Sequence, residues 1–94
     1  MTKSKSNAVR LYVGSNNFTH EVEIAKLRAI LDGELEAYTI IPASGVWRGV
    51  SEDSAIVEIS GINALRARAI AESLKIGLDQ QAIGISTIPA LAFI

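Results

Sequence analysis

Two β-rich runs, separated by a glycine-containing connector, constrain the fold of this chain most. The runs are residues 38–42 and 55–59, and the connector is residues 43–54. Val, Ile, Thr and Tyr are enriched in strands, so each run is predicted to form a strand. Because the connector is longer than a tight hairpin turn, we expect an exposed loop, and long loops in compact domains are often functional.

The rest of the chain alternates strand and helix patterns around this pair. Thr19 is a suitable N-cap for a first helix, and Gly33 is a suitable residue to end it. Asn63 or Ser60 is suited to cap a second helix, with Leu65, Ala69, Ile70 and Leu74 facing inward. The predicted strands are residues 9–13, 37–41, 55–59 and 82–87, and the predicted helices are residues 19–31 and 63–76.

This order, β-α-β-β-α-β, is typical of the α+β ferredoxin-like fold: a four-stranded antiparallel sheet with two helices on one face. The handedness rule for crossover connections leaves few other ways to fold it. Pro42 lacks an N–H group, so its strand should weaken there or lie at an edge. We expect residues 1–7 to be a disordered N-terminal lead and residues 8–94 to be a single domain with an apolar C-terminal tail.

Composition favours self-association. The 94 residues are 49% apolar, and the mean hydropathy of +0.30 is high for a small domain, which buries only about 60–65% of its unfolded surface. Part of that apolar surface is therefore expected between copies, as a trimer or a dimer. A net charge of −1 argues against nucleic acid as a partner.

Other function classes are disfavoured by what the chain lacks. Cysteine is absent, which removes disulfides, thiolate nucleophiles and cysteine-ligated metals. His20 is the only histidine and has no evident catalytic partner, and Glu52 and Asp53 point to opposite sides of an extended chain. We expect no enzyme activity, no metal and no cofactor. Without disulfides the stability must come from packing, which suits a cytoplasmic protein. No segment is long enough to span a membrane.

The connector carries the best candidate site. Gly45 and Gly49 allow backbone N–H groups to approach a ligand, and Arg48 is suited to grip a phosphate or carboxylate. Trp47 is suited to stack on a base or to anchor a protein contact, and Ser44 opens the same stretch. The alternative is a hairpin loop whose Trp47 packs on its own sheet or on a neighbouring subunit. The residue pattern alone does not distinguish a recognition site from such a packed hairpin loop.

The whole pattern resembles the PII-like signalling proteins. The likeness rests on residues 38–41 entering the connector, residues 55–59 leaving it, and Lys75-Ile76-Gly77 before the last strand. The resemblance implies a homotrimer with a mobile loop between its second and third strands. It also implies that the Lys75-Ile76-Gly77 run belongs to a loop, in which Lys75 and Gly77 contact nucleotide phosphates between subunits. The connector is shorter than in the nitrogen-regulating members and contains no Tyr to be modified.

The leading hypothesis is therefore a non-enzymatic, PII-like regulatory subunit of short-loop type. It would bind a small anionic ligand, such as an adenine nucleotide, between subunits, while the 43–54 loop contacts a target protein. The expected ligand-binding residues are Ser44, Gly45, Trp47, Arg48, Gly49, Lys75 and Gly77. Two alternatives are a protein-interaction module without a small ligand and a small dimeric α/β-barrel enzyme.

Overall fold

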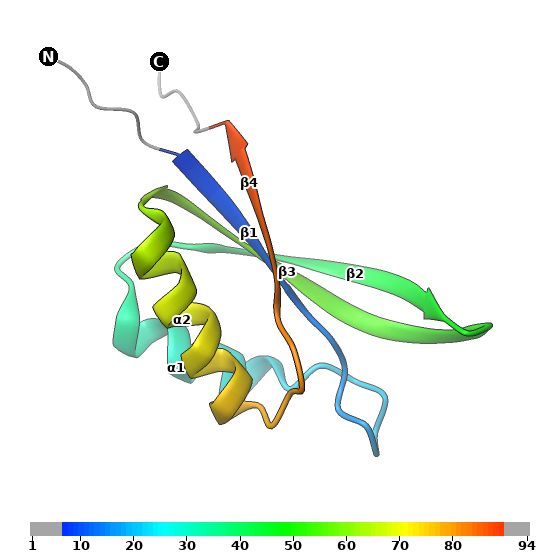
Figure 1. Cartoon of the computed structure of the whole chain (residues 1–94). Helices are drawn as coiled ribbons and strands as arrows, with labels where there is room; N and C mark the ends of the chain where they lie inside the picture. Colours follow the sequence, from blue (N-terminus) through cyan, green and yellow to red (C-terminus); the bar gives the residue numbers. More distant parts are fainter. Residues whose placement is uncertain (1–6, 90–94) are drawn as a thin grey trace, which may run out of the picture.

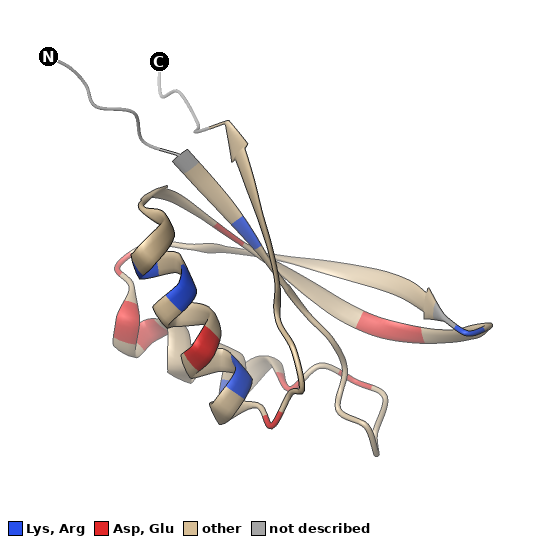
Figure 2. Cartoon of the chain, in the orientation of Figure 1, with Lys and Arg blue, Asp and Glu red and all other residues tan. Residues whose placement is uncertain are grey.

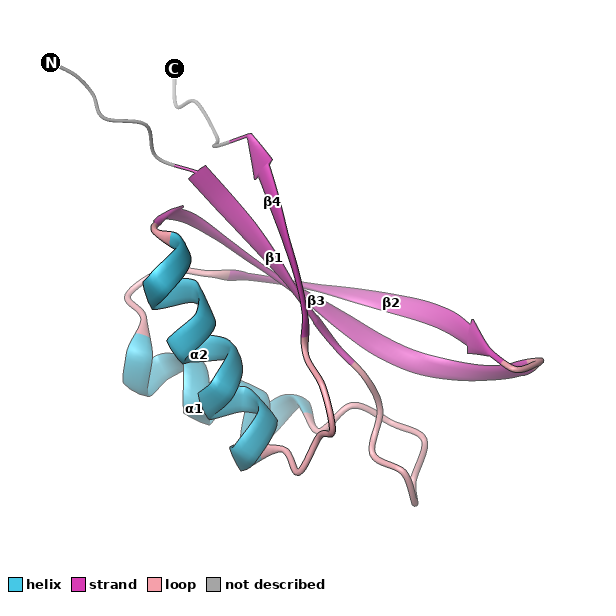
Figure 3. Cartoon of the chain, viewed as in Figure 1, coloured by secondary structure: helices cyan, strands magenta, loops and turns pink. Residues whose placement is uncertain are grey.

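The structure, a computed structural model, describes residues 7–89 and has the βαββαβ element order (Figures 1 and 3). One four-stranded sheet carries both helices on the same face, so the predicted ferredoxin-like fold is confirmed. The elements are β1 (Asn7–Val13), α1 (Ile24–Glu34), β2 (Thr39–Trp47), β3 (Val50–Ile62), α2 (Ala64–Gly77) and β4 (Gly84–Pro89).

The sheet is antiparallel throughout, in the order β2-β3-β1-β4. Along the central strands β1 and β3, buried residues alternate with more exposed ones, and the buried residues face the helices. Pro42 lies on β2, which is an edge strand, so its missing N–H group disrupts no inner ladder. The largest fully buried side chains are Leu11, Leu27, Leu31, Ile70, Leu74, Val13 and Val57.

The predicted loop at residues 43–54 is wrong. The β2–β3 pairing continues without a break to Trp47 opposite Val50, and only Arg48 and Gly49 form the turn. These two residues have φ of 51° and 80°, both positive, as in the type I′ turns that match strand twist in two-residue hairpins. The Ser, Gly and Asp residues of the segment have weak strand propensity, but cross-strand pairing overrides it.

The continued hairpin extends beyond the four-stranded sheet as a two-stranded arm (Figure 1). Pairing between β1 and β3 ends at Val13 opposite Ala55, so residues 50–54 pair only with β2. We call residues 43–54 the arm. Val46 and Val50 near its tip are 70% and 54% exposed.

The first helix begins later than predicted. It starts at Ile24, and Thr19 belongs to the preceding loop, where its hydroxyl accepts a hydrogen bond from the Glu21 N–H. The Asn16 side-chain oxygen organises the same loop, since it accepts the Thr19 N–H at 3.1 Å. Gly33 lies inside the helix, which ends at Glu34. The Thr19 cap and the Gly33 stop were therefore wrong: local side-chain bonds hold the loop out of the helix.

The second helix begins as predicted. The Asn63 side chain accepts a hydrogen bond from the Arg66 N–H at 2.8 Å, which is N-cap geometry. Ile70 and Leu74 are buried as predicted, but Leu65 is 81% exposed and Ala69 is also exposed, so those two predictions are wrong. The inward residues are Ala67, Ile70, Ala71 and Leu74.

The predicted ends of the chain fall mostly outside the described part. Residues 1–6 of the expected lead and residues 90–94 of the expected tail lie beyond it, whereas Asn7 begins β1 and Pro89 ends β4. No helix within residues 7–89 is both long enough and apolar enough to cross a membrane.

Candidate functional site

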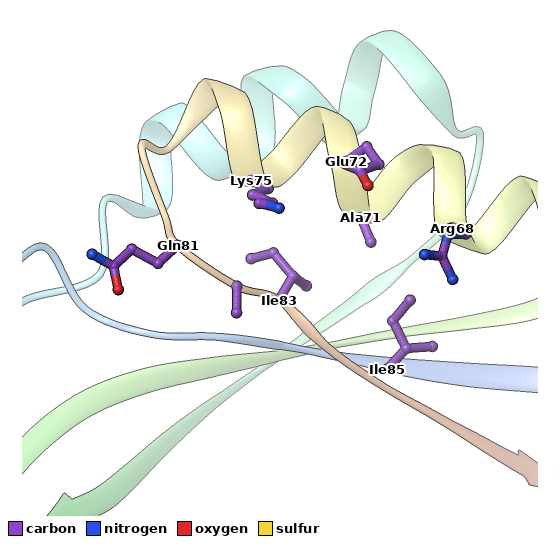
Figure 4. A pocket seen from close by; sticks show the side chains of 8 residues that line it. Arg68, Ala71, Glu72, Lys75, Gln81, Ile83 and Ile85 are labelled. Carbon is purple, nitrogen blue, oxygen red and sulfur yellow. The ribbon is translucent and has the colours of Figure 1, made fainter.

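A groove of about 230 Å³ runs between α2 and the chain leading into β4 (Figure 4). The polar side chains of α2 project over it, and isoleucines from the β4 side form its apolar floor. We call it the α2–β4 groove. Its lining residues are Arg68, Ala71, Glu72, Lys75, Gln81, Ala82, Ile83 and Ile85.

The helical repeat explains the polar wall. Arg68, Glu72 and Lys75 follow one another at four and three residues, so they lie on one face of α2. Figure 2 shows this mixed charge along α2. Ile83 and Ile85 come from the strand side and offer an apolar surface below. Cationic groups above an apolar floor suit a ligand that carries both a flat apolar part and an anionic group.

The structure does not bring the predicted site residues together within one chain. Lys75 lines the α2–β4 groove, to which the arm contributes no residue. Ser44, Gly45 and the Arg48–Gly49 turn lie in the arm, which points away from the helices (Figure 1). Trp47 ends β2 opposite Val50. A single site containing all of these residues would require two copies of the chain.

The Lys75-Ile76-Gly77 run is not a loop, as the PII resemblance implied, but the last turn of α2. Gly77 allows close packing of the two helices: a Cβ there would lie 2.5 Å from the Ile30 Cδ1 of α1. Gly77 does not line the groove. Its local environment therefore accounts for the glycine through packing, and phosphate contact by Lys75 and Gly77 stays a prediction.

Several groove residues were not among the predicted site residues. Arg66, Arg68, Glu72 and Lys75 are the charged residues of α2. The structure separates Arg66 from this group, because its guanidinium bonds the Glu34 carboxylate at 3.2 Å and the Glu34 carbonyl at 2.6 Å. The helical spacing of Arg68, Glu72 and Lys75 was the signal in the sequence that could have identified these three residues as neighbours. Nothing local indicated that residues 81–85 would lie beneath them.

The sheet face opposite the helices carries a polar row. The Arg10 Nε lies 2.8 Å from a Glu58 carboxylate oxygen, and this hydrogen bond raises the pKa of Arg10 above its ordinary value. The Tyr12 and Ser86 hydroxyls are 3.2 Å apart on the neighbouring strands. Glu58 therefore lies on the open face as half of an ion pair.

Metal-ligating residues do not gather in the described part of the chain. Between residues 7 and 89, no three His, Cys, Asp or Glu side chains lie close enough to hold an ion. His20 is exposed in the loop before α1. This arrangement offers no metal centre from which to argue a function.

No family model matches the sequence, and no curated protein is similar to it. Its fold, however, matches several solved structures. A DUF3240 family protein from Shewanella baltica OS155 aligns with a TM-score of 0.60 and 14% identity, over 97% of this chain and 96% of that chain.

Two further similar structures have different names. The divalent cation tolerance protein CutA1 from Thermus thermophilus aligns with a TM-score of 0.58 and 14% identity, over 96% of this chain and 88% of that chain. A phage SAM lyase in its apo state aligns with a TM-score of 0.62 and 18% identity, over 94% of this chain and 92% of that chain. At these identities the comparison establishes the shared fold.

Proposed function

We propose that this protein binds a small adenosine-containing ligand with an anionic group, at a site formed between copies in a homotrimer. The α2–β4 groove of one copy would supply the charged wall, and the arm of a neighbour would close it. The observation that carries this proposal is the groove itself, with Arg68 and Lys75 above the isoleucine floor.

The lining residues of the α2–β4 groove suit this ligand, but the volume of the groove is small. Lys75 and Arg68 suit the anionic group, and Ile83 with Ile85 suits one face of an adenine ring. Its volume of about 230 Å³ is below the roughly 300–1,000 Å³ of most small-molecule sites. A second wall would enlarge and close it.

The arm is the available second wall. A two-stranded ribbon is marginally stable alone in water, and Val46 and Val50 expose apolar surface at its end. Contact with another copy would cover these valines. The same contact would bring Gly45, Arg48 and Gly49 of one copy toward Lys75 of the next, which unites the predicted site residues.

Regulation without turnover is the role that fits this site best. The groove offers two cationic side chains, one carboxylate and an apolar floor for binding, and its lining contains no Ser, Thr, Cys or His to act as a nucleophile. The PII resemblance points the same way, with binding altering the contacts of the arm with a target protein.

The test combines native mass spectrometry with calorimetry. The protein as purified should be a trimer, and it should bind one or more of AMP, ADP, ATP and S-adenosylhomocysteine. Lys75→Gln should weaken binding at least tenfold, whereas Lys26→Gln on α1, outside the groove, should not. A monomer that binds none of the four compounds would overturn the proposal.

A second candidate is an enzyme that consumes S-adenosylmethionine. It is favoured by the alignment with the phage SAM lyase over nearly the full length of both chains. The two candidates separate in one measurement: proton NMR of S-adenosylmethionine incubated with the protein. Loss of the sulfonium methyl signal faster than in buffer would establish turnover, and an unchanged signal with detectable binding would favour the regulator.

A further inference from the structure

A second groove, of about 360 Å³, lies on the other side of the Gln81–Ala82 segment. It forms where the end of β1, the base of the arm and the chain after α2 meet. We call it the Ser15–Glu52 groove. Its lining residues are Gly14, Ser15, Asn17, Glu52, Asp79, Gln80, Gln81 and Ala82.

One wall of this groove is held in place by Gln80. The Gln80 Nε2 donates to the carbonyls of Gly14 at 3.4 Å and Ser15 at 3.3 Å. The Gln80 N–H donates in turn to the Lys75 carbonyl at 2.8 Å, which ties the wall to α2. A Cβ on Gly14 would lie 3.3 Å from the Gln80 Oε1. The groove is therefore preformed.

Ser15 presents an unused hydroxyl to this groove. The residue is only 8% exposed, and within residues 7–89 its hydroxyl has no hydrogen-bond partner, since Gln80 contacts its carbonyl instead. The hydroxyl oxygen is not sealed from solvent, so the groove is its opening. Because this hydroxyl opens to the groove and bonds to no described protein group, it is available to bond to a ligand bound there.

The two grooves differ in charge. The Ser15–Glu52 groove contains the carboxylates of Glu52 and Asp79 and no cationic side chain. The α2–β4 groove contains the cationic side chains of Arg68 and Lys75 and one carboxylate, that of Glu72. Gln81 and Ala82 line both grooves, so a ligand that reaches both sides of this short segment would meet only acidic charges on one side and mainly basic charges on the other.

We infer that the Ser15–Glu52 groove holds the protonated amino group of the ligand whose anionic group lies beside Lys75. Carboxylate, hydroxyl and amide oxygens are acceptors, which suits the three N–H donors of an ammonium group. This inference rests on the proposed function and narrows its ligand class. The ligand is an adenosine-bearing amino acid rather than a nucleoside polyphosphate, because Glu52 and Asp79 repel additional phosphate charge.

The test compares ligands that differ only at this end. S-adenosylhomocysteine carries the amino acid group, and 5′-methylthioadenosine lacks it. By calorimetry, S-adenosylhomocysteine should bind at least tenfold more tightly than 5′-methylthioadenosine and more tightly than ATP. Glu52→Gln and Ser15→Ala should each reduce that preference and leave the affinity for 5′-methylthioadenosine unchanged.

Asp53→Asn is the matched control. Asp53 is adjacent to Glu52, is exposed and does not line the groove, so the same loss of charge should leave the preference intact. Equal affinities for S-adenosylhomocysteine and 5′-methylthioadenosine would overturn the inference and leave the proposed function standing. Absence of binding by all adenosine compounds would overturn both. Circular dichroism of each variant confirms that it folds.

Discussion

The two halves of the β2–β3 hairpin are paired alike and buried differently. In the inner half, Val57 and Ile59 of β3 are 0% and 2% exposed beneath the helices. In the arm, Val46 and Val50 are 70% and 54% exposed, although the same cross-strand register continues to the turn. Backbone pairing alone therefore does not explain what stabilises each of the two halves.

The difference separates two sources of stability. Burial of apolar side chains stabilises the inner half within one chain. The arm has no helix and no third strand behind it, so a single copy offers little to hold its apolar tip. We infer that the inner half determines folding and that the arm determines what the folded chain contacts.

The largest expected effect lies in the inner sheet. Leu11→Ala removes a fully buried side chain from central β1, and such changes cost about 2–5 kcal/mol of unfolding free energy. Leu65→Ala makes the same substitution at a site that is 81% exposed and should cost roughly 0.5 kcal/mol or less. Urea unfolding measures both, and equal losses would contradict this assignment of the core.

Substitutions in the arm should instead affect association more than unfolding. Replacing Val46 and Val50 by Ser should weaken association at least tenfold and change unfolding of the separated chains little, because both side chains are mostly exposed in one copy. Sedimentation velocity measures the association. Ile76→Ser, at an exposed apolar site on α2, is the control. Unchanged association of the double variant would remove the arm from the interface.

The fold was predictable because each element carries its own pattern. The alternation of Val9, Leu11 and Val13 placed most of β1, and Asn63, one of two candidate caps, is where α2 is capped. The arm was missed because a type I′ turn usually carries Asn or Asp before Gly, and here Arg48 takes that position. Thr19 failed as a cap because its hydroxyl serves a turn within the preceding loop.

The candidate site was harder to predict than the fold. Lys75 was named through a resemblance, and it does line a groove. Ile83 and Ser15 could not be placed from sequence, because each meets its groove only through tertiary contacts with a distant element. Grooves between elements depend on packing, and periodicity within one element does not report that.

Alanine substitutions at two glycines should have opposite, moderate effects on stability. Gly49 has φ of 80° in the arm turn, so Gly49→Ala should destabilise the arm by roughly 1 kcal/mol. Gly33 is helical and has open space around it, so Gly33→Ala should stabilise α1 by about 0.4–1 kcal/mol. Amide hydrogen exchange locates each change. Loss of protection across the whole sheet in Gly49→Ala would contradict the independence of the arm.

The smallest expected effect concerns pH at the inner end of the hairpin. The Tyr38 hydroxyl donates to the Asp32 carboxylate at 2.6 Å, which raises the pKa of Tyr38 above its ordinary 10.0. Since the folded pKa is raised, the contribution of this bond to stability is complete below the unfolded pKa. It is lost as the pH rises through the folded pKa.

Tyrosinate absorbance tests this in a Tyr12→Phe background, where Tyr38 is the remaining tyrosine of the two. Asp32→Ala should lower the pKa of Tyr38, because it removes both the acceptor and its negative charge. Asp53→Ala in the arm should leave it unchanged, since Asp53 lies in the arm rather than beside Tyr38. If both variants shifted the titration equally, the arm would be coupled to the inner half, and the separation of the two halves would fail.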